Sequence, residues 1–384
     1  MGAFLATCTA AGEQSSTDAL IAAIEGPQSN RDGDLVGLTL EDAMKKTGVP
    51  GASIAVIKDF DIQWSRGYGV SDVTTGARTT PDTLFQAASI SKPITAMAVL
   101  KAVQDGRFTL DQDVNELLTS WKIPANEATA RQPVTLRGLL SHTSGTDDGF
   151  GFPGYNPAAP VPTPVQILNG AKPSNVGAVL MARPPLTAYK YSGGGLTLVQ
   201  LLLTDVLKRP FPDILRETVL TPLGMTHSAY EQPLSPERDR QAARGHDRTG
   251  AAHDVKWHVY PELAAAGLWT TAPDLARFGI ELQKSLQGRS NKVLTRATVL
   301  EMASPVGVGP FAIGMDIRNI GEGWYLGHGG SNWGFQCLVL VHKLKGYGFA
   351  AMTNSDSGGR LVAELQQRVA AAYKWDMLDK PLRR

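Results

Sequence analysis

The apolar residues of this 384-residue chain change their spacing along its length, and the change predicts where strands and helices lie. Near the start, residues 52–58 and 62–68 are rich in β-branched and aromatic side chains and flank a short turn, which predicts a hairpin. Near the end, residues 335–341 and 347–353 repeat that arrangement. Strands are therefore expected at both ends of the chain.

Between these hairpins the pattern is helical. From residue 111 to 261 we expect helices and long loops with few strands, and a Gly- and Pro-rich excursion over residues 147–175. Thr39 and Thr271 each precede an acidic residue by three positions, as helix N-caps do. An amphipathic helix on Leu361, Leu365, Val369 and Ala372 closes the chain.

Strands at both ends with helices between them predict an α/β (α+β) fold. We expect an antiparallel sheet flanked by helices and built from both termini, with a mostly helical domain inserted into it. The expected sheet domain is 35–88 plus 262–384, and the helical domain is 89–261, with the active site between them. Residues 1–34 are expected to be a flexible N-terminal segment, loose or only partly helical.

The first twelve residues resemble the tail of an export signal, and Leu5-Ala6-Thr7-Cys8 is close to a lipoprotein cleavage box. The alternative is a flexible start of no significance. The first interpretation implies a periplasmic or secreted protein, and a cytoplasmic location stays open.

Composition excludes several classes of partner. A net charge of +1 gives no reason to expect nucleic acid, and no apolar run approaches the roughly 18–20 residues that span a bilayer. The two cysteines and seven histidines do not have the spacing of metal ligands, so we expect no metal and no cofactor. Cys337 lies in an apolar run and is expected to be buried.

Ser89 and Lys92 are the strongest candidates for chemistry. They are three residues apart at the start of an apolar helical pattern, so they share a face and the amine can reach the hydroxyl. A serine becomes a good nucleophile when a neighbour takes its proton. An isolated Ser-x-x-Lys is common by chance, and its ordinary alternative is a helix start with the lysine in solvent.

Two further segments contain groups that acyl transfer requires. Tyr189 to Gly195 offers Tyr191, a phenol that a nearby ammonium could hold partly ionised for proton transfer. Leu326 to Phe335 enters a strand with paired glycines and a free N–H at Ser331 to hold an oxyanion. Taken alone, each has an ordinary alternative: a buried tyrosine before a helix, and a glycine-rich bulge beside an incidental histidine.

Together and in this order, the three segments resemble the motifs of the penicillin-recognising serine hydrolases, the serine β-lactamase and penicillin-binding-protein superfamily. Ser89 and Lys92 match its S-x-x-K, Tyr191 its Y-S-x, and His328-Gly329-Gly330 its H-x-G. Supporting stretches cover residues 67–72, 139–145, 222–225 and 265–269. The chain is most similar to the branch with class C β-lactamases, family VIII carboxylesterases and D-alanyl-D-alanine carboxypeptidases.

The resemblance implies a mechanism and the residues that carry it. Ser89 attacks a carbonyl while Lys92 and Tyr191 share its proton, and the N–H groups of Ser89 and Ser331 form the oxyanion hole. His328 is included with the catalytic residues because it opens the third motif. Substrate-binding residues are implied to be Tyr189, Gly329, Gly330 and Trp333. For Lys92 to act as a base, its pKa must fall by about three units.

Two departures from the superfamily pattern narrow the substrate. Gly193 stands where the superfamily has an asparagine that holds a substrate amide, and His328 stands where a lysine would hold a carboxylate. Neutral His328 weakens recognition of a β-lactam without harming ester cleavage. We therefore expect a carboxylesterase acting through an acyl-enzyme on short-chain esters.

Three alternatives stay open, and the oligomeric state is not predicted. The chain could be a D-alanyl-D-alanine carboxypeptidase or a weak β-lactamase, both of which also act on a small ester or amide. A non-catalytic penicillin-binding or sensor module is the alternative of another class.

Overall fold

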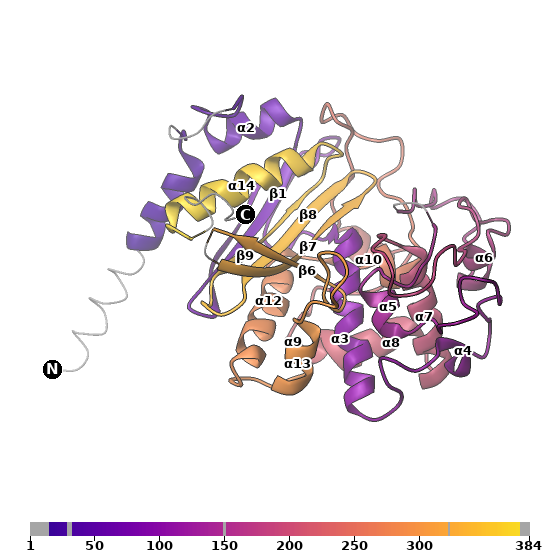
Figure 1. Cartoon of the computed structure of the whole chain (residues 1–384). Helices are drawn as coiled ribbons and strands as arrows, with labels where there is room; N and C mark the ends of the chain where they lie inside the picture. The colour runs from indigo at the N-terminus through magenta and orange to yellow at the C-terminus, as the bar shows by residue number, and fades with distance from the viewer. Residues whose placement is uncertain (1–14, 29–32, 149–150, 322, 377–384) are drawn as a thin grey trace.

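The computed structural model describes residues 15–28, 33–148, 151–321 and 323–376 (Figure 1). Within these residues, seven strands form an antiparallel sheet in the order β3-β2-β1-β9-β8-β7-β6. The strands are β1 (Gly51–Lys58), β2 (Asp61–Asp72), β3 (Ala77–Arg78), β6 (Asp316–Ile320), β7 (Gly323–Asn332), β8 (Phe335–His342) and β9 (Gly348–Thr353). A separate pair consists of β4 (Phe85–Gln86) and β5 (Trp269–Thr270).

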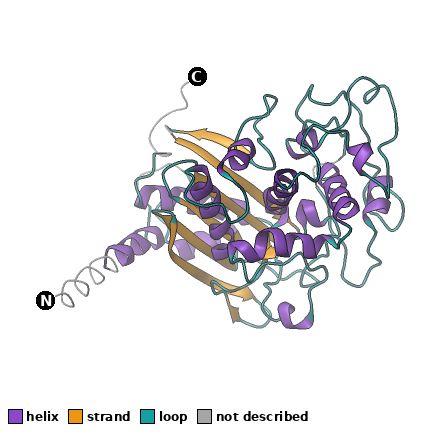
Figure 2. Cartoon of the chain, turned by 90° about the horizontal axis from the view of Figure 1, so that it is seen from below, coloured by secondary structure: helices purple, strands orange, loops and turns teal. Residues whose placement is uncertain are grey.

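The central strands are apolar on both faces because both faces are covered. In β1, Ala55 and Ile57 join one hydrophobic cluster while Ile54 and Val56 join the other, as the period of two along a strand requires. Helix α12 (Ala272–Leu286) packs on the first face. Helices α14 (Gly358–Ala372) and α2 (Leu40–Thr47) lie on the second, and Figure 2 shows the layers from another side.

The two predicted hairpins therefore meet in one sheet, because β1 pairs with β9. The predicted fold class, an antiparallel sheet from both ends of the chain with a mostly helical insertion, is confirmed. The threonine caps are confirmed as well, since Thr39 accepts from the N–H of Asp42 and Thr271 from that of Asp274.

The helical region lies beside the sheet, on the right in Figure 1. Its elements and the remaining short helices are η1 (Ala88–Ile90), α3 (Ser91–Gln104), α4 (Val114–Leu117), α5 (Leu136–Leu140), α6 (Pro164–Asn169), α7 (Gly194–Leu207), α8 (Phe211–Leu215), η2 (Arg216–Leu220), α9 (Thr221–Leu223), α10 (Pro236–Asp239), α11 (Leu263–Ala266) and α13 (Arg296–Met302). Helix α3 is buried on nearly all sides, because α8, α11, α13 and η2 pack around it.

Residues 15–25 are helical, so the segment before residue 35 is partly helical, which is the second of the two forms expected for it. Ile21 and Ile24 of this helix are buried in the cluster beneath α14. The buried guanidinium of Arg368 donates to the carbonyls of Ile24 and Gly26 at 3.0 and 2.9 Å. The apolar stripe is only two turns long, so the sequence pattern did not separate it from the polar residues around it. Cys8 lies outside the described residues.

The predicted division into 35–88 plus 262–384 and 89–261 stays a prediction. Leu84 and Phe85 on one side of it share a hydrophobic cluster with Ile94 and Val99 on the other.

Candidate active site

Ser89 lies in η1, the single 3₁₀ turn that continues directly into α3. The residue before it, Ala88, has a φ of 49°, a left-handed conformation that costs energy for any residue with a side chain. Ser91 holds this turn, because its Oγ donates to the Ala88 carbonyl at 2.6 Å and accepts from the N–H of Leu268 at 3.0 Å. The strained turn thus leaves Ser89 partly exposed while its neighbours are buried.

Lys92 is brought to Ser89 as the spacing predicts. Its Nζ lies 2.9 Å from the Ser89 Oγ and also donates to the carbonyl of Ala265, at 2.8 Å. Burial lowers the pKa of Lys92 to about 7, and the charge of Asp148 opposes the shift only in part. The amine is therefore half deprotonated near neutral pH, as a general base for serine must be.

Tyr191 completes the group with a hydrogen bond to the Ser89 side chain. Burial raises the pKa of Tyr191 above its ordinary value of 10. The expectation of a partly ionised phenol is therefore wrong. The Lys92 amine lies 4.9 Å from the centre of the tyrosine ring and is itself easily deprotonated, so it does not hold a phenolate. At neutral pH the phenol of Tyr191 is therefore protonated, and the Lys92 amine is the group of the pair that loses its proton more readily.

Asp148, at the end of the loop that precedes residue 149, holds the second motif, Tyr191 to Gly193, in place. Asp148 accepts from the Ser192 Oγ at 2.5 Å and from the N–H of Gly194 at 2.8 Å, at the N-terminus of α7. An anion there is favoured by the helix dipole. His142 accepts from the N–H of Ser192 through Nδ1 at 3.2 Å, and its ring packs on that of Tyr191 with centres 4.2 Å apart.

The third motif, His328 to Gly330, lies on β7 just beyond the point where the neighbouring strand β6 stops pairing with it. Strand β6 pairs with β7 only as far as Gly327, so residues 328–332 have an open edge on that side. On the other side, β8 pairs with β7 through the turn that Asn332 and Phe335 close. Hydrogen-bonded and non-hydrogen-bonded residue pairs alternate along an antiparallel ladder. Because Asn332 and Phe335 close the turn as a hydrogen-bonded pair, the next pair, Ser331 with Gln336, is not hydrogen-bonded, and the N–H of Ser331 points to the open edge. An oxyanion donor requires this orientation.

Gly330 permits the close approach of β7 to the nucleophile turn. A Cβ on Gly330 would lie 2.2 Å from the carbonyl oxygen of Ala87. The neighbouring thiol of Cys337 contacts the same oxygen at 3.0 Å and is buried as expected. Gly330 therefore packs against backbone, whereas a Cβ on Gly329 would meet only the carbonyl oxygen of Cys337, at 3.8 Å.

His328 is buried beside the group, with its ring centre 6.1 Å from that of Tyr191. Burial, followed by the charge of Lys92, lowers its pKa to about 3. Its Nδ1 lies 2.5 Å from the Gly329 carbonyl oxygen. The imidazole is neutral at physiological pH, as the sequence predicted, and does not supply a positive charge.

Trp333 and Tyr189 are half-buried at the edge of the site. Trp333 is stacked between His253 and His258, with ring centres 3.8 and 3.9 Å away, so only the edge of its indole is free to meet a substrate. Tyr189 stacks on Phe311 at 5.7 Å. The substrate-binding roles of these two residues, and of Gly329 and Gly330, stay predictions.

Comparison with known proteins agrees with this geometry. The family model described as Beta-lactamase matches residues 38–374. The chain belongs to the beta-lactamase family. It is 25% identical over 323 residues to protein flp of Staphylococcus aureus, a match that covers 83% of this chain and 62% of that protein. It is 27% identical over 320 residues to penicillin-binding protein 4 of Amycolatopsis lactamdurans, covering 80% and 81%.

Solved structures of related fold resemble most of this chain. The D-amino acid amidase of Ochrobactrum anthropi superimposes with a TM-score of 0.69 at 23% identity, over 93% of this chain and 99% of that one. At this identity the likeness shows that the two proteins share their fold.

Sequence reasoning missed three groups that this family member brings to the site: His142, Asp148 and the carbonyl of Ala265. His142 and Ala265 lie in the stretches 139–145 and 265–269, which support the resemblance without giving either residue a role. Asp148 and Ala265 reach Ser192 and Lys92 from 44 and 173 positions away in the sequence. The pattern of residues around Asp148 and Ala265 does not indicate these contacts.

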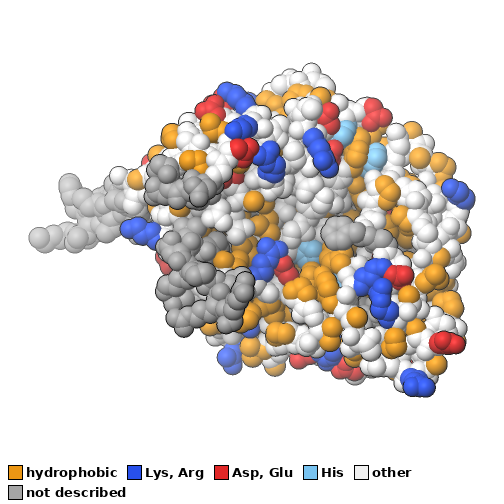
Figure 3. Space-filling view, turned by 45° about the horizontal axis from the view of Figure 1, so that its top comes forward, with side chains coloured by type: hydrophobic (Ala, Val, Ile, Leu, Met, Phe, Trp, Pro, Cys, Tyr) orange, Lys and Arg blue, Asp and Glu red, His pale blue; other side chains and the backbone are white. Residues whose placement is uncertain are grey.

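Other features of the described residues do not compete with this site. A cavity of about 730 Å³ lies between α2 and β2, away from Ser89. The described residues contain no group of three side chains that could hold a metal, and none of their helices is long and apolar enough to cross a membrane. On the face in Figure 3, basic and acidic side chains are interspersed rather than gathered by sign.

Proposed function

We propose that this protein is a serine hydrolase that works through an acyl-enzyme and cleaves short-chain carboxylic esters. The observation that carries the proposal is the contact of 2.9 Å between the Ser89 hydroxyl and a lysine whose pKa is lowered to about 7. A buried lysine of this kind costs stability, and such perturbed groups cluster at functional sites.

In the first half of the reaction, the neutral amine of Lys92 takes the proton of Ser89 as its oxygen attacks the ester carbonyl. The carbonyl oxygen becomes an oxyanion, held by the N–H groups of Ser89 and Ser331. Each such donor contributes on the order of 3–4 kcal/mol to the transition state. The bond to the leaving alcohol then breaks, Tyr191 protonates its oxygen, and the Lys92 ammonium returns a proton to Tyr191.

In the second half, a water molecule attacks the acyl-enzyme. Tyr191 accepts the proton of that water while it passes its own proton to Lys92, which is neutral again, and the same two N–H groups hold the second oxyanion. The carboxylic acid leaves and the proton returns to the Ser89 oxygen. The cycle uses only groups that this chain contributes.

Esters are favoured over β-lactams and D-alanyl peptides because the site lacks two substrate-binding groups, one for a side-chain amide and one for a carboxylate. Gly193 has no side-chain amide, and His328 is neutral with a pKa of about 3. A β-lactam or a D-Ala-D-Ala end requires its side-chain amide and carboxylate to be held, whereas an activated ester requires only the nucleophile, the proton carriers and the oxyanion donors. The D-alanyl carboxypeptidase and the weak β-lactamase are therefore the second candidates.

The deciding experiment compares kcat/KM for para-nitrophenyl butyrate, nitrocefin and a D-Ala-D-Ala peptide. We expect the butyrate ester to be cleaved well and the other two poorly. A clear preference for nitrocefin or for the peptide would overturn the esterase assignment and favour the corresponding second candidate.

The non-catalytic alternative is tested by labelling. A fluorophosphonate should label wild-type protein at Ser89, and a fluorescent penicillin that acylates it should be released with time. Stable penicillin labelling without turnover of any ester would indicate a binding or sensor module.

We also propose a periplasmic or secreted location, supported by the signal-like sequence around Cys8. Mass spectrometry of the protein from its native cells would find Cys8 lipidated or the start removed; an intact start in the cytoplasm would contradict the proposal.

A further inference from the structure

Phe152 occupies the space beside Gly193, the position at which the side-chain amide is missing. A Cβ on Gly193 would lie 2.5 Å from Cε2 of the Phe152 ring and 3.1 Å from its Cζ. The ring therefore lies directly against the backbone of the second motif, two residues after Tyr191. An aromatic ring from a distant loop therefore fills the space that a side chain at position 193 would enter.

Phe152 belongs to an anchored segment. The next residue, Pro153, accepts from His258 Nδ1 at 3.0 Å, and the carbonyl of Gly154 accepts from Asn175 at 2.9 Å. Tyr155 then pairs with Val259 through two backbone hydrogen bonds of 2.8 Å. A side chain held in this way can select among substrates, because its position does not adjust freely to each of them.

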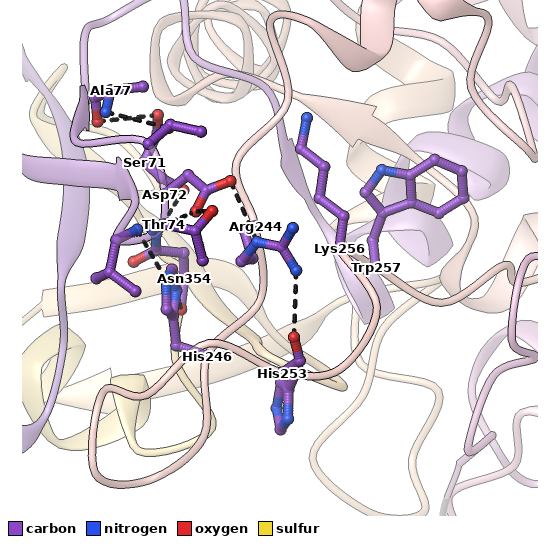
Figure 4. A network of polar contacts seen from close by, with 12 residues as sticks. Ser71, Asp72, Thr74, Ala77, Arg244, His246, His253, Lys256, Trp257 and Asn354 are labelled. Atoms are coloured by element: carbon purple, nitrogen blue, oxygen red, sulfur yellow. Dashed lines mark hydrogen bonds and ion pairs between the residues drawn. The ribbon is translucent and has the colours of Figure 1, made fainter.

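The same segment leads to Trp333. His258 stacks on one face of the indole and His253 on the other, and Trp333 is two residues after the oxyanion donor Ser331. Arg244 fixes the second histidine, since it donates to the His253 carbonyl and pairs with Asp72, both at 3.1 Å (Figure 4). The two histidine rings that enclose the indole are hydrogen-bonded themselves, His253 to Asp356 and His258 to Pro153, each at 3.0 Å, so the position of Trp333 is fixed from both faces.

These contacts put one fixed ring beside each half of the machinery: Phe152 beside the segment of Tyr191, and Trp333 beside that of Ser331. We propose that Phe152 and the edge of Trp333 form an aromatic wall that receives the acyl side of the substrate. The wall selects a short acyl group ending in an apolar ring, such as phenylacetyl, over a bare acetyl group and over an acyl group with an amide. This inference rests on the proposed function and names its substrate class.

The test compares three para-nitrophenyl esters: the acetate, the phenylacetate and the N-acetylglycinate. Each kcat/KM is divided by the rate of the same ester with hydroxide, which removes intrinsic reactivity. We expect wild-type protein to prefer the phenylacetate over each of the others by about tenfold or more, the range that one apolar contact supplies. Phe152→Ala should remove this preference mainly by raising KM for the phenylacetate, while the acetate changes less than about threefold.

Phe152→Leu is the matched variant, because it keeps an apolar side chain in the same space and removes the ring. It should fold even if Phe152→Ala does not, and should retain part of the preference. Equal losses on all three esters in both variants would indicate a merely structural role and overturn the wall. So would a wild-type protein that does not distinguish the esters.

A second measurement separates this inference from the proposed function. Ser89 is labelled with two fluorophosphonates that differ only in a benzyl or a methyl group on phosphorus, which match the phenylacetyl and acetyl groups. Faster labelling by the benzyl reagent, lost in Phe152→Ala, would support the wall even in a protein that cleaves no ester. Equal rates with the two reagents would overturn the wall even if esters are cleaved.

Discussion

Two regions lie beside Ser89 and differ in their polar groups: the catalytic group, made of Ser89, Lys92 and Tyr191, and the recognition region around Gly193 and His328. In the catalytic group, the Lys92 amine has partners at 2.8 and 2.9 Å, and Tyr191 is hydrogen-bonded to Ser89. In the recognition region, Gly193 has no side chain and His328 is neutral, and aromatic rings lie beside both places: Phe152 beside Gly193, and Tyr191 and Phe311 beside His328. The difference is that polar contacts hold the Ser89, Lys92 and Tyr191 side chains, whereas apolar and neutral rings fill the region around Gly193 and His328.

Removing the proposed nucleophile, Ser89, should have the largest effect on the reaction rate. Ser89→Ala should lower kcat/KM at least about 1,000-fold on every ester that wild type cleaves, because Ser89 carries the only serine or threonine hydroxyl that is hydrogen-bonded to Lys92 among the described residues. The change removes one oxygen from a partly exposed side chain, so the thermal unfolding midpoint should hardly move. Ser304→Ala is the control and should keep full activity, because Ser304 is an exposed serine two residues beyond the end of α13. Substantial esterase activity in folded Ser89→Ala would disprove the assignment.

The second prediction concerns the two proton carriers. Lys92→Ala and Tyr191→Phe should each slow acylation at least about 100-fold, the low end for a positioned acid or base. Both act on the same proton, so the double variant should be little slower than the worse single variant. Single-turnover rates measure this, with Tyr189→Phe as the matched loss of a nearby phenol hydroxyl. A double variant slowed by the product of the two single effects would show that Lys92 and Tyr191 act independently.

Ser89, Lys92 and Tyr191 could be predicted from the sequence, whereas the residues that surround them could not. Helix caps such as Thr39, the β-strands and the Ser89–Lys92 spacing depend on residues close together in the chain, so the sequence pattern predicts them directly. The contacts of Asp148 with Ser192 and of Phe152 with Gly193 join segments more than forty positions apart. Their chemistry depends on packing that no period in the sequence describes. The neutral state of Tyr191 was likewise missed, because burial decides it.

The pH dependence should separate the two regions further. Lys92 accepts a proton only when it is deprotonated, and its pKa is lowered to about 7. The kcat/KM for an ester should therefore fall about tenfold per pH unit below pH 6 and level off above pH 8. His328, with a pKa of about 3, adds no step, and the raised pKa of Tyr191 leaves the plateau intact to pH 9.

Asp148→Asn is the variant that identifies the group behind this step. The charge of Asp148 raises the pKa of Lys92, so its removal should move the midpoint of the profile to lower pH. A purely structural role for Asp148 would lower the plateau and leave the midpoint in place. A wild-type midpoint near pH 10, or a falling limb between pH 7 and 9, would contradict Lys92 as the base.

The smallest expected effect on rate comes from Glu262, which lies between the two regions. Its backbone carbonyl accepts from the N–H groups of Ala265 and Ala266 in α11, the helix that holds Lys92. Its side chain is fully buried near Tyr155 and Tyr260, and neither carboxyl oxygen has a hydrogen-bond partner among the described residues. Burial raises the pKa of Glu262 to about 8.

A carboxyl whose pKa is higher in the folded than in the unfolded protein favours folding only while it is protonated. Stability should be full below the unfolded pKa of 4.5, fall as pH rises to about 8, and then level off. Glu262→Gln keeps the shape and removes the titration, so wild type should lose up to about 4 kcal/mol of unfolding free energy relative to it between pH 5 and 8.5. Urea unfolding at both pH values measures this, while kcat/KM at pH 7 should change little. Equal pH dependence in the two proteins would mean that Glu262 does not titrate in this range, and a large loss of activity would mean that the carboxyl takes part in catalysis.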